Sequence, residues 1–472
     1  MRTRLALLAA ALAAFGGSLA SGFHFDDYAI FSSVGTHSLW WCLQQTRPLT
    51  YLTFWLNYRA GGENPLGYHA VNLALHLVAV LLLYEALRRL IPPEAAFVAS
   101  AIFAVHPIQA EAVEYVWGRS IVLAAVFCFA SLLEWVRGRQ WIAVGWFAAG
   151  LLAKEECAAF PVALIVGQAM LPAAACQAAR RLKAGGSQDW LPHISMLALS
   201  LLAGVRVIYA TAVTPGAPAG FQAGISPWHY FLAQGLVIWR YLRLLVLPFG
   251  FTVDPAIAIP PLWLGLLAWA GLAALAWRWR WLLIGFLLLL PSSSIFPAQD
   301  LAADRRMYLP LAAFTVAAAL ALPRKFSTWI VLALIALSIG RTYIWMSDER
   351  LWREAAAQAP NKVRPKIQLS RNVAPAEALT LLAQARQLAP GDPAIATETG
   401  KVLLSQGNAA AALSEFGRAL ALDPHDAQNY NNRGVALQAL GLTEPARQDY
   451  LRALAIDPAL TEALRNLKRL GP

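Results

Sequence analysis

Apolar runs long enough to cross a lipid bilayer recur along most of this 472-residue chain, from Leu5 to about Ile344. A helix of about 20 apolar residues spans the roughly 30 Å of hydrocarbon in a bilayer. Charged residues make up only 14% of the chain, whereas a soluble domain has about 25%. Because a chain in lipid must satisfy its backbone hydrogen bonds internally, the sequence predicts an all-α domain with several membrane-crossing helices.

Small basic clusters between the apolar runs predict how this domain is oriented. Four of them fall on every second connection, and such clusters mark cytoplasmic loops. We therefore expect a cytoplasmic N-terminus and place residues 23–67 outside. The formal net charge of +11 reflects mostly such clusters, so we expect no nucleic-acid partner. The four clusters are Arg2/Arg4, Arg88/Arg89, Arg137/Arg139 and Arg180/Arg181/Lys183.

The segment at residues 228–247 decides the total number of crossings. It contains Arg240 and Arg243, and a lipid-facing arginine at mid-bilayer costs about 2.5 to 3.5 kcal/mol on insertion scales. If the segment crossed, the basic clusters at 278–280 and 324–325 would lie outside; if it is re-entrant or interfacial, both lie inside. We adopt the second interpretation, which predicts eleven crossings and an outer C-terminus. The expected crossings lie near residues 5–22, 68–87, 95–106, 120–136, 140–153, 157–173, 190–212, 261–277, 281–296, 308–322 and 327–344.

Residues 2–20 also fit a cleavable signal peptide, because they have a basic start followed by apolar and small residues. We prefer an uncleaved crossing helix, since the sequence FHFDDY at residues 23–28 would then lie just beyond the membrane face. The chain has four cysteines without CxxC or metal-ligand spacing, so neither a zinc site nor a disulfide framework is expected. They are Cys42, Cys128, Cys157 and Cys176.

The C-terminal part is soluble in composition and contains a repeat. Pro390, Pro424 and Pro458 are each 34 residues apart, which is the tetratricopeptide period of paired helices. Residues 461–470 are expected to form a terminal capping helix. The sequence therefore predicts two domains, a multi-spanning membrane domain at 1–350 and a tetratricopeptide-repeat domain at 351–472. Small and aromatic positions repeat with the same period: Gly400, Ala412, Phe416 and Ala419 correspond to Gly434, Ala446, Tyr450 and Ala453.

Four of the expected outer loops contain polar residues from which a site could be built. Asp26 and Asp27 are adjacent carboxylates, which can hold a divalent cation, or one can accept a proton while the other orients it. Arg305 and Arg306 offer bidentate donors suited to phosphate. Further candidates in or beside these loops are Arg47, His69, His106, Glu111, Arg119, Lys154, Asp304 and Tyr308.

Each candidate also has a purely structural interpretation. Asp26 and Asp27 can cap a helix, and the histidines can join buried helices. Arg305 and Arg306 can anchor the chain at the membrane interface, and Lys154 can pair with a neighbouring glutamate. No glycine-rich phosphate loop and no nucleophile elbow occurs in the sequence.

Six segments together resemble the membrane-embedded glycosyltransferases of the C type, or GT-C. Most specifically, they resemble the transmembrane and tetratricopeptide-repeat O-mannosyltransferases and their bacterial relatives. The resemblance covers the chain end to end, with the membrane domain before the repeats. The segments are FDDY at 25–28, RPLTYLTFWLNY at 47–58, GYHAVNLALH at 67–76, FAVHPIQAEAVEYVWGR at 103–119, AKE at 153–155 and RRMYLP at 305–310.

This resemblance implies transfer of a sugar, with mannose as one candidate, from a polyprenyl-phosphate carrier to a hydroxyl acceptor, with inversion at the anomeric carbon. The family's acidic motif falls on Asp26 and Asp27. Asp27 is then the expected general base, with Asp26 orienting it, and the pair is also a candidate site for Mg²⁺ or Mn²⁺. The expected donor-phosphate ligands are Arg305, Arg306, Lys154 and Arg119. The expected residues of the substrate cavity are Arg47, His69, His106, Glu111, Asp304 and Tyr308.

The resemblance also implies a place in the cell and a set of partners. We expect a multi-pass protein of the bacterial inner membrane, with the active site and the repeats on the extracytoplasmic face. Its partners would be membrane lipid, the lipid-linked donor, and an acceptor protein or glycolipid that the repeats could hold.

Two other classes of function remain open. A non-catalytic membrane scaffold would recruit envelope partners through its repeats, but it has no use for a carboxylate pair beside arginine-rich loops. A transporter would have charges deep inside its helices and internal repeats across the membrane domain. Neither feature is evident in the sequence, which favours the transferase.

Overall fold

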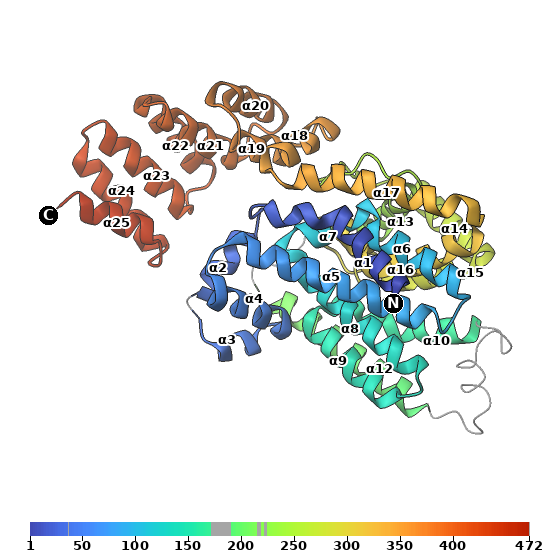
Figure 1. The fold of residues 1–472 in the computed structure, drawn as a ribbon. Coiled ribbons are helices and arrows are strands. Elements are labelled where there is room, and N and C mark those ends of the chain that lie inside the picture. Colours follow the sequence, from blue (N-terminus) through green and yellow to red (C-terminus); the bar gives the residue numbers. More distant parts are fainter. Residues whose placement is uncertain (36, 171–189, 215–218, 221–223, 472) are drawn as a thin grey trace. The chain divides into compact units, whose positions relative to one another are not determined.

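The computed structural model describes residues 1–35, 37–170, 190–214, 219–220 and 224–471 (Figure 1). Apart from one isolated bridge between Ala219 and Ala298, its regular elements are helices, which confirms the predicted all-α class. Cys176 and the basic cluster at 180–183 lie outside the described residues, as does the end of the crossing expected near 157–173.

The chain divides into two compact units. The first, here called the membrane unit, comprises Met1–Val253 and Ile257–Ser347, and the second, the repeat unit, comprises Asp254–Ala256 and Asp348–Pro472. The division falls where the apolar runs stop and charged residues become frequent, because lipid and water select different side chains for the outside of a fold.

Each of the eleven expected crossings coincides with a helix of the membrane unit. These helices are α1 (Arg2–Phe15), α5 (Pro65–Leu87), α6 (Pro93–Val105), α8 (Arg119–Val136), α9 (Gln140–Ala153), α10 (Phe160–Met170), α12 (Leu191–Val213), α14 (Leu262–Arg278), α15 (Arg280–Leu289), α16 (Tyr308–Ala321) and α17 (Arg324–Trp345).

Only some of these helices are long and apolar enough to cross a membrane. Within the described residues there are five, or six if the bent pair Pro93–Val105 and Pro107–Glu114 is one span. Helices α9, α14 and α15 are apolar but shorter. The structure therefore does not confirm the predicted total of eleven crossings. The five spans are Arg2–Ala20, Pro65–Leu87, Val116–Val136, Leu191–Val213 and Arg324–Trp345.

Helices α1 and α5 run antiparallel, and their contacts define two distinct ends of the membrane unit. At one end the Arg4 side chain donates to Glu85 at 2.8 Å, and Arg88 and Arg89 pair with the same carboxylate. At the other end His69 Nε2 lies 3.0 Å from the Gly22 carbonyl oxygen. The two N-terminal basic clusters thus share one end, as clusters on the same side of a membrane would.

Short helices cover the opposite end, where the sequence motifs lie, and we call it the motif end. They are α2 (Asp27–Gly35), α3 (Leu39–Gln44), α4 (Pro48–Gly61), α7 (Ala110–Glu114) and the 3₁₀ turns at Pro107–Gln109, Val116–Gly118, Glu155–Ala159 and Asp304–Met307.

Helix α13 (Pro227–Val246) is the segment expected to be re-entrant or interfacial. Its Arg240 pairs with Asp304 at 2.5 Å; the Asp304 side chain is buried and that of Arg240 is 12% exposed. Tyr230 donates to the Ser292 carbonyl oxygen at 2.7 Å, and Gln234 donates to the Leu301 carbonyl oxygen at 2.9 Å. The helix therefore packs along residues 292–304, and the cost assumed for a lipid-facing Arg240 does not apply, because a carboxylate partners the guanidinium.

The repeat unit consists of paired helices. Gly400 and Gly434 explain the close pairing, because a Cβ atom there would lie 2.6 Å from the rings of Phe416 and Tyr450 respectively. Leu467 and Leu470 pack against the cluster around Tyr450, so the last helix covers the end of the array as predicted. The helices are α18 (Asp348–Gln358), α19 (Val363–Ser370), α20 (Pro375–Leu388), α21 (Pro393–Ser405), α22 (Ala409–Leu422), α23 (Ala427–Ala439), α24 (Thr443–Ile456) and α25 (Thr461–Arg469).

Candidate functional site

Asp27 stands at the start of α2 with a backbone hydrogen bond to each of its carboxylate oxygens. Its Oδ2 accepts from the backbone N–H of His24 at 3.0 Å, and its Oδ1 accepts from the backbone N–H of Trp117 at 2.9 Å. The side chain is 0% exposed, and burial raises its pKa to about 7, although His24 and the backbone N–H donors oppose that shift. Phe25, which lies between His24 and Asp27 in the chain, has a positive φ of 48°, a conformation that non-glycine residues seldom adopt. Asp27 thus holds a tight turn and ties it to the loop that precedes α8.

Asp26, in contrast, is exposed. The Tyr115 hydroxyl donates to its Oδ2 at 3.3 Å. A carboxylate with one such partner keeps lone pairs that a substrate can reach. Of the two adjacent acids, Asp26 is therefore the one that faces outward.

Helix α7 connects this acidic turn to the arginine pair. Glu111 on α7 accepts from the Arg305 backbone N–H at 3.1 Å and pairs with its guanidinium. Tyr115 follows Glu111 by about one helical turn and reaches Asp26. Burial raises the pKa of Tyr115, and Arg305 is near enough to oppose this shift. The acidic turn and Arg305 therefore lie at the same end of the membrane unit, as the sequence hypothesis requires.

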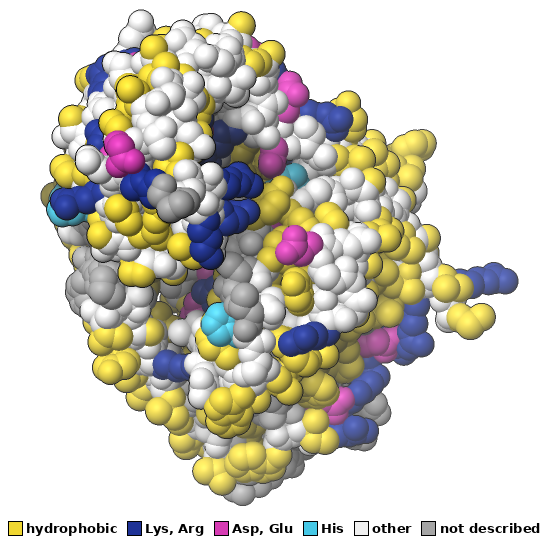
Figure 2. All heavy atoms as spheres, turned by 90° about the vertical axis from the view of Figure 1, so that its left-hand side faces the viewer, with side chains coloured by type: hydrophobic (Ala, Val, Ile, Leu, Met, Phe, Trp, Pro, Cys, Tyr) yellow, Lys and Arg dark blue, Asp and Glu magenta, His cyan; other side chains and the backbone are white. Residues whose placement is uncertain are grey.

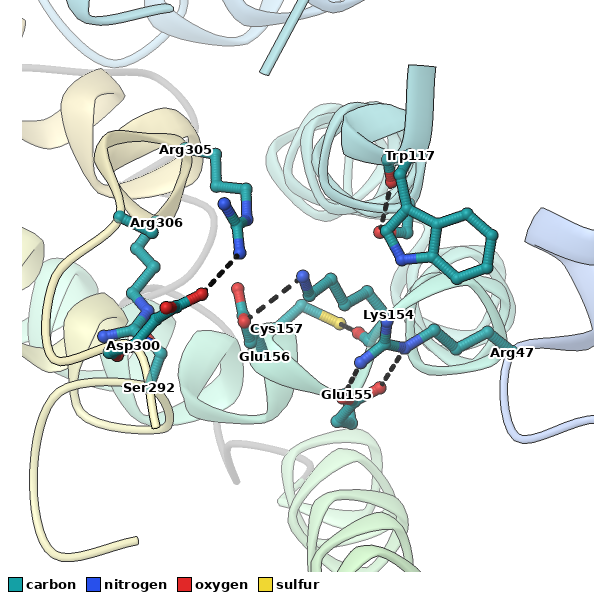
Figure 3. Close-up of polar contacts among 12 residues, drawn as sticks. Arg47, Trp117, Lys154, Glu155, Glu156, Cys157, Ser292, Asp300, Arg305 and Arg306 are labelled. Carbon is teal, nitrogen blue, oxygen red and sulfur yellow. Dashed lines mark hydrogen bonds and ion pairs between the residues drawn. The ribbon is translucent and has the colours of Figure 1, made fainter. Parts of the chain in front are cut away.

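A second charged cluster extends from the end of α9 to the N-terminus of α4 (Figure 3). Lys154 pairs with Glu156 at 3.3 Å, and Arg47 forms two hydrogen bonds to Glu155, at 2.5 and 3.0 Å. Burial lowers the pKa of Lys154 to about 8, although Glu156 opposes that shift. Burial would raise the pKa of Glu155, but Arg47 holds it at about 2. Lys154 is thus a cation near neutral pH that can lose its proton in mild alkali.

Arg306 differs from its neighbours in its partners. Its guanidinium donates to the Tyr230 hydroxyl at 3.2 Å and to the carbonyl oxygens of Leu301 and Asp300 at 3.1 and 2.7 Å. No carboxylate of the described chain lies within ion-pair distance of it. Arg306 is therefore held by neutral groups rather than by a direct ion pair, although Glu156 lies near enough to favour its charged form.

Five other predicted site residues brace the fold. Arg119 is buried and donates to Asn72 at 2.8 Å and Asn57 at 2.6 Å, which joins α5 to α4. None of the five lines the two cavities described next. The other four are His69, bonded to Gly22; His106, 3.2 Å from the Leu245 carbonyl oxygen; Tyr308, 2.7 Å from His76; and Asp304, paired with Arg240.

Two adjoining cavities lie in the membrane unit. The smaller, of about 20 Å³, is lined by Lys154, Glu156 and Arg306 together with Cys157, Ser292 and several apolar side chains. The larger, of about 120 Å³, is lined almost wholly by apolar side chains of α5, α8, α10, α15 and α16. Leu288 and Leu309 line both cavities. A cationic chamber thus adjoins an apolar one, which no sequence pattern indicated, because the lining comes from five separate helices.

The described residues do not fit the metal site that was considered for Asp26 and Asp27. Asp27 already gives both oxygens to backbone N–H groups. No group of three or more His, Cys, Asp or Glu side chains that could hold an ion occurs in the part of the chain that the structure describes. A divalent cation needs several oxygen ligands, which this pair does not supply.

Exposed hydrophobic side chains mix with lysines and arginines on the surface (Figure 2). Along α12, for example, Leu201 and Leu202 are exposed. A soluble protein seldom leaves so much apolar surface uncovered. This surface fits a protein that lies in lipid.

Comparison with known proteins shows tetratricopeptide repeats at the C-terminus. Residues 400–441 match the family model described as TPR repeat, and residues 427–460 match the model described as tetratricopeptide repeat. The predicted repeat is confirmed. Among solved structures, YrrB, described as a TPR protein with an unusual peptide-binding site, is 22% identical and covers 32% of this chain and 82% of that one, with a TM-score of 0.25. That score is too low for the likeness to carry an argument.

Similar proteins also confirm the resemblance that the motifs indicated. Protein O-mannosyl-transferase F38B6.6 of Caenorhabditis elegans is 42% identical over 98 residues, which are 20% of this chain and 14% of that protein. Protein O-mannosyl-transferase Tmtc1 of Drosophila melanogaster is 40% identical over 129 residues, 26% of this chain and 14% of that protein. Protein O-mannosyl-transferase TMTC4 of Mus musculus is 26% identical over 416 residues, 70% of this chain and 55% of that protein. The matched segments thus cover from about a seventh to about half of the length of these relatives.

Proposed function

We propose that this chain is a membrane-embedded glycosyltransferase that moves a sugar from a polyprenyl-phosphate carrier to a hydroxyl acceptor. Its similarity to proteins named O-mannosyl-transferases supports a glycosyltransferase. Mannose is the first sugar to test, and a protein hydroxyl is the first acceptor to test.

The pair of adjoining cavities carries the proposal. A polyprenyl phosphate has an anionic head and a long hydrocarbon chain. Lys154 and Arg306, which line the smaller cavity, offer cations to the head, and the apolar cavity that shares Leu288 and Leu309 suits the first part of the chain. A scaffold protein would have no need of a cavity with two cationic side chains beside an apolar one.

The leaving group of the proposed reaction is the carrier phosphate. The bond between the sugar's anomeric carbon and the phosphate oxygen breaks while the acceptor oxygen bonds to the opposite face of that carbon, which inverts its configuration. Lys154 and Arg306 stabilise the charge that develops on the departing phosphate, because fixed cations in a water-poor site act strongly. Arg305, on the Asp304–Met307 turn, is paired with Glu111 of α7, and this pair fixes the turn that carries Arg306.

The acceptor hydroxyl loses its proton to a carboxylate in this step. Sequence motifs point to Asp27 as that base, but its two oxygens are occupied by backbone N–H groups and no part of it is exposed. Asp26 is exposed and oriented by Tyr115. We therefore assign proton acceptance to Asp26 and the positioning of its turn to Asp27.

The proposed location is a bacterial inner membrane, with the motif end and the repeats on the extracytoplasmic side. The basic cluster around Glu85 at the opposite end supports this orientation through the positive-inside tendency. Eleven crossings, with α13 along the outer surface, complete the proposed topology. In this arrangement the repeats could hold the acceptor protein or glycolipid.

The test uses the full chain purified into lipid nanodiscs with mannosyl polyprenyl phosphate and a serine- and threonine-containing acceptor peptide. We expect release of free polyprenyl phosphate and a β- or α-linked product of inverted configuration. The Asp26→Asn variant should melt at the same temperature and release the carrier about 10²- to 10⁴-fold more slowly. If wild-type protein releases no carrier from mannosyl or glucosyl donors, with peptide, glycolipid or sugar acceptors, the enzyme assignment is wrong.

A further inference from the structure

We propose that Tyr51 and Trp117 form the platform on which the donor's sugar ring lies, with the paired Arg47 and Glu155 as partners for its hydroxyl groups. This inference rests on the proposed function and assigns a carbohydrate subsite within it.

Aromatic rings form a contiguous row at the motif end. The Trp41 and Tyr51 ring centroids are 5.5 Å apart, and the Tyr51 and Trp117 centroids are 6.0 Å apart; both pairs meet edge to face. All three side chains are only partly buried. The buried Phe54 ring stacks on Trp117 with centroids 5.7 Å apart and belongs to the core packed around α2 and α4, so it supports the row from the interior.

One end of this row is joined to the acidic turn. The backbone N–H of Trp117 donates to Asp27 at 2.9 Å, so the position of Trp117 and the position of the turn that carries Asp26 depend on each other. A platform linked in this way would hold a sugar ring in a fixed relation to the proposed proton acceptor.

The middle of the row adjoins the charged cluster. Tyr51 follows Arg47 by one turn of α4, and Arg47 lies near enough to act on the Tyr51 hydroxyl. Thr50 donates to the Ala153 carbonyl oxygen at 2.9 Å, which places this part of α4 beside Lys154. Figure 3 shows Trp117 together with Arg47, Glu155 and Lys154 in one view. The platform thus lies between the acidic turn and the proposed phosphate ligands, where the ring that joins phosphate to acceptor must be.

The chemistry of these groups suits a pyranose. Its C–H bonds form an apolar face that packs on an aromatic ring, while its hydroxyl groups need donors and acceptors at the ring's edge. Arg47 and Glu155 are paired with each other but retain further donor and acceptor positions. The Tyr51 hydroxyl adds a third polar group beside Arg47. Few polar groups among aromatic walls are typical of a small-ligand site.

The experiment measures equilibrium binding of two ligands to the full chain in nanodiscs: mannosyl polyprenyl phosphate and sugar-free polyprenyl phosphate of equal chain length. Tyr51→Ala should lower the affinity for the sugar-bearing ligand about five- to tenfold and leave that for the sugar-free ligand unchanged. Trp117→Phe, which keeps a ring on Phe54, should do the same to a smaller extent. Trp40→Ala is the matched control, because Trp40 is 68% exposed and is not part of the row.

The platform proposal would be overturned if Tyr51→Ala lowered the affinity for both ligands equally. It would also be overturned if neither Tyr51→Ala nor Trp117→Phe lowered the affinity for either ligand. The proposed function itself fails in a different way, namely if the wild-type protein transfers no sugar from any polyprenyl-phosphate donor. Melting temperatures of all variants show whether a loss of affinity comes from unfolding instead. A variant that melts early is replaced by Tyr51→Phe, which should lower the affinity for the sugar-bearing ligand only.

Discussion

The Tyr115 hydroxyl lies 3.3 Å from Asp26 Oδ2, and this contact joins the acidic turn to the helix whose Glu111 holds Arg305. The acids and the cations of the proposed reaction are thus connected through one short element, α7. Displacement of α7 would separate the acids from the cations. The proposed mechanism therefore requires α7 to stay in this position.

Substitution of each acid separately tests the roles assigned to Asp26 and Asp27. We expect Asp26→Asn to lower turnover by about 10²- to 10⁴-fold, the range typical of a lost general base, with an unchanged melting temperature. Asp27→Asn places an amide group against backbone donors and should destabilise the membrane unit by about 1 to 3 kcal/mol. Turnover and thermal melting are measured on the same samples. Retained turnover in the Asp26 variant would return the role of base to Asp27.

Donor binding should weaken as the pH rises through about 8. Lys154 has a pKa lowered to about 8, so it is positively charged below that pH and becomes neutral above it. Loss of a cation beside the phosphate raises the KM for the donor. Lys154→Arg should remove this dependence, because a guanidinium stays protonated. The measurement is donor KM from pH 6.5 to 9.5, and an equal pH profile in both proteins would show that Lys154 does not contact the phosphate.

Filling the apolar cavity should affect long carriers more than short ones. Ala313 on α16 lines this cavity, and Ala313→Phe would occupy space that the hydrocarbon chain needs. We expect KM to rise several-fold for a long polyprenyl donor and little for a two-isoprene analogue. Ala321→Phe on the same helix is the control, since Ala321 is exposed. The cavity would not be the carrier site if both chain lengths were affected equally.

The repeat unit should be sensitive to a methyl group at Gly434. A Cβ atom there would lie 2.6 Å from the Tyr450 ring, and overpacking of this kind costs about 1 to 3 kcal/mol. Gly434→Ala should therefore increase hydrogen exchange in α23 and α24 of the full chain. Gly417→Ala, where a Cβ atom meets nothing within 4 Å, should not increase it. Equal exchange in the two variants would contradict the packing described for this pair of helices.

The proposed topology is tested with reporter fusions after Tyr343. Because the basic clusters fall on every second connection between crossings, an extracytoplasmic signal is predicted at this point. A cytoplasmic signal would mean that α13 crosses the membrane, since Arg240 is paired with Asp304 and its charge is no barrier to insertion. Fusions within residues 36–38 provide the outer reference.

Much of the repeat unit could be predicted from the sequence, because its contacts are local. The helix pairs α21/α22 and α23/α24 each lie within one 34-residue period, so Gly400 and Phe416 are close in the chain as well as in space. The number of crossings was harder to predict. Helices α9, α14 and α15 are apolar but short, and composition alone does not show whether such a helix crosses lipid.

The sequence by itself determined that this chain has an all-α membrane unit, a C-terminal repeat, and motifs rich in acids and cations. Only the tertiary structure decided which of those side chains are buried in contacts within the fold: Asp27 and Arg119 are, whereas Asp26 is exposed and Arg306 lines a cavity. The physical reason is that a side chain's availability depends on which distant groups already bind it. The Trp117 N–H that occupies Asp27 is 90 residues away, and the Asn57 and Asn72 that bind Arg119 lie on two other helices.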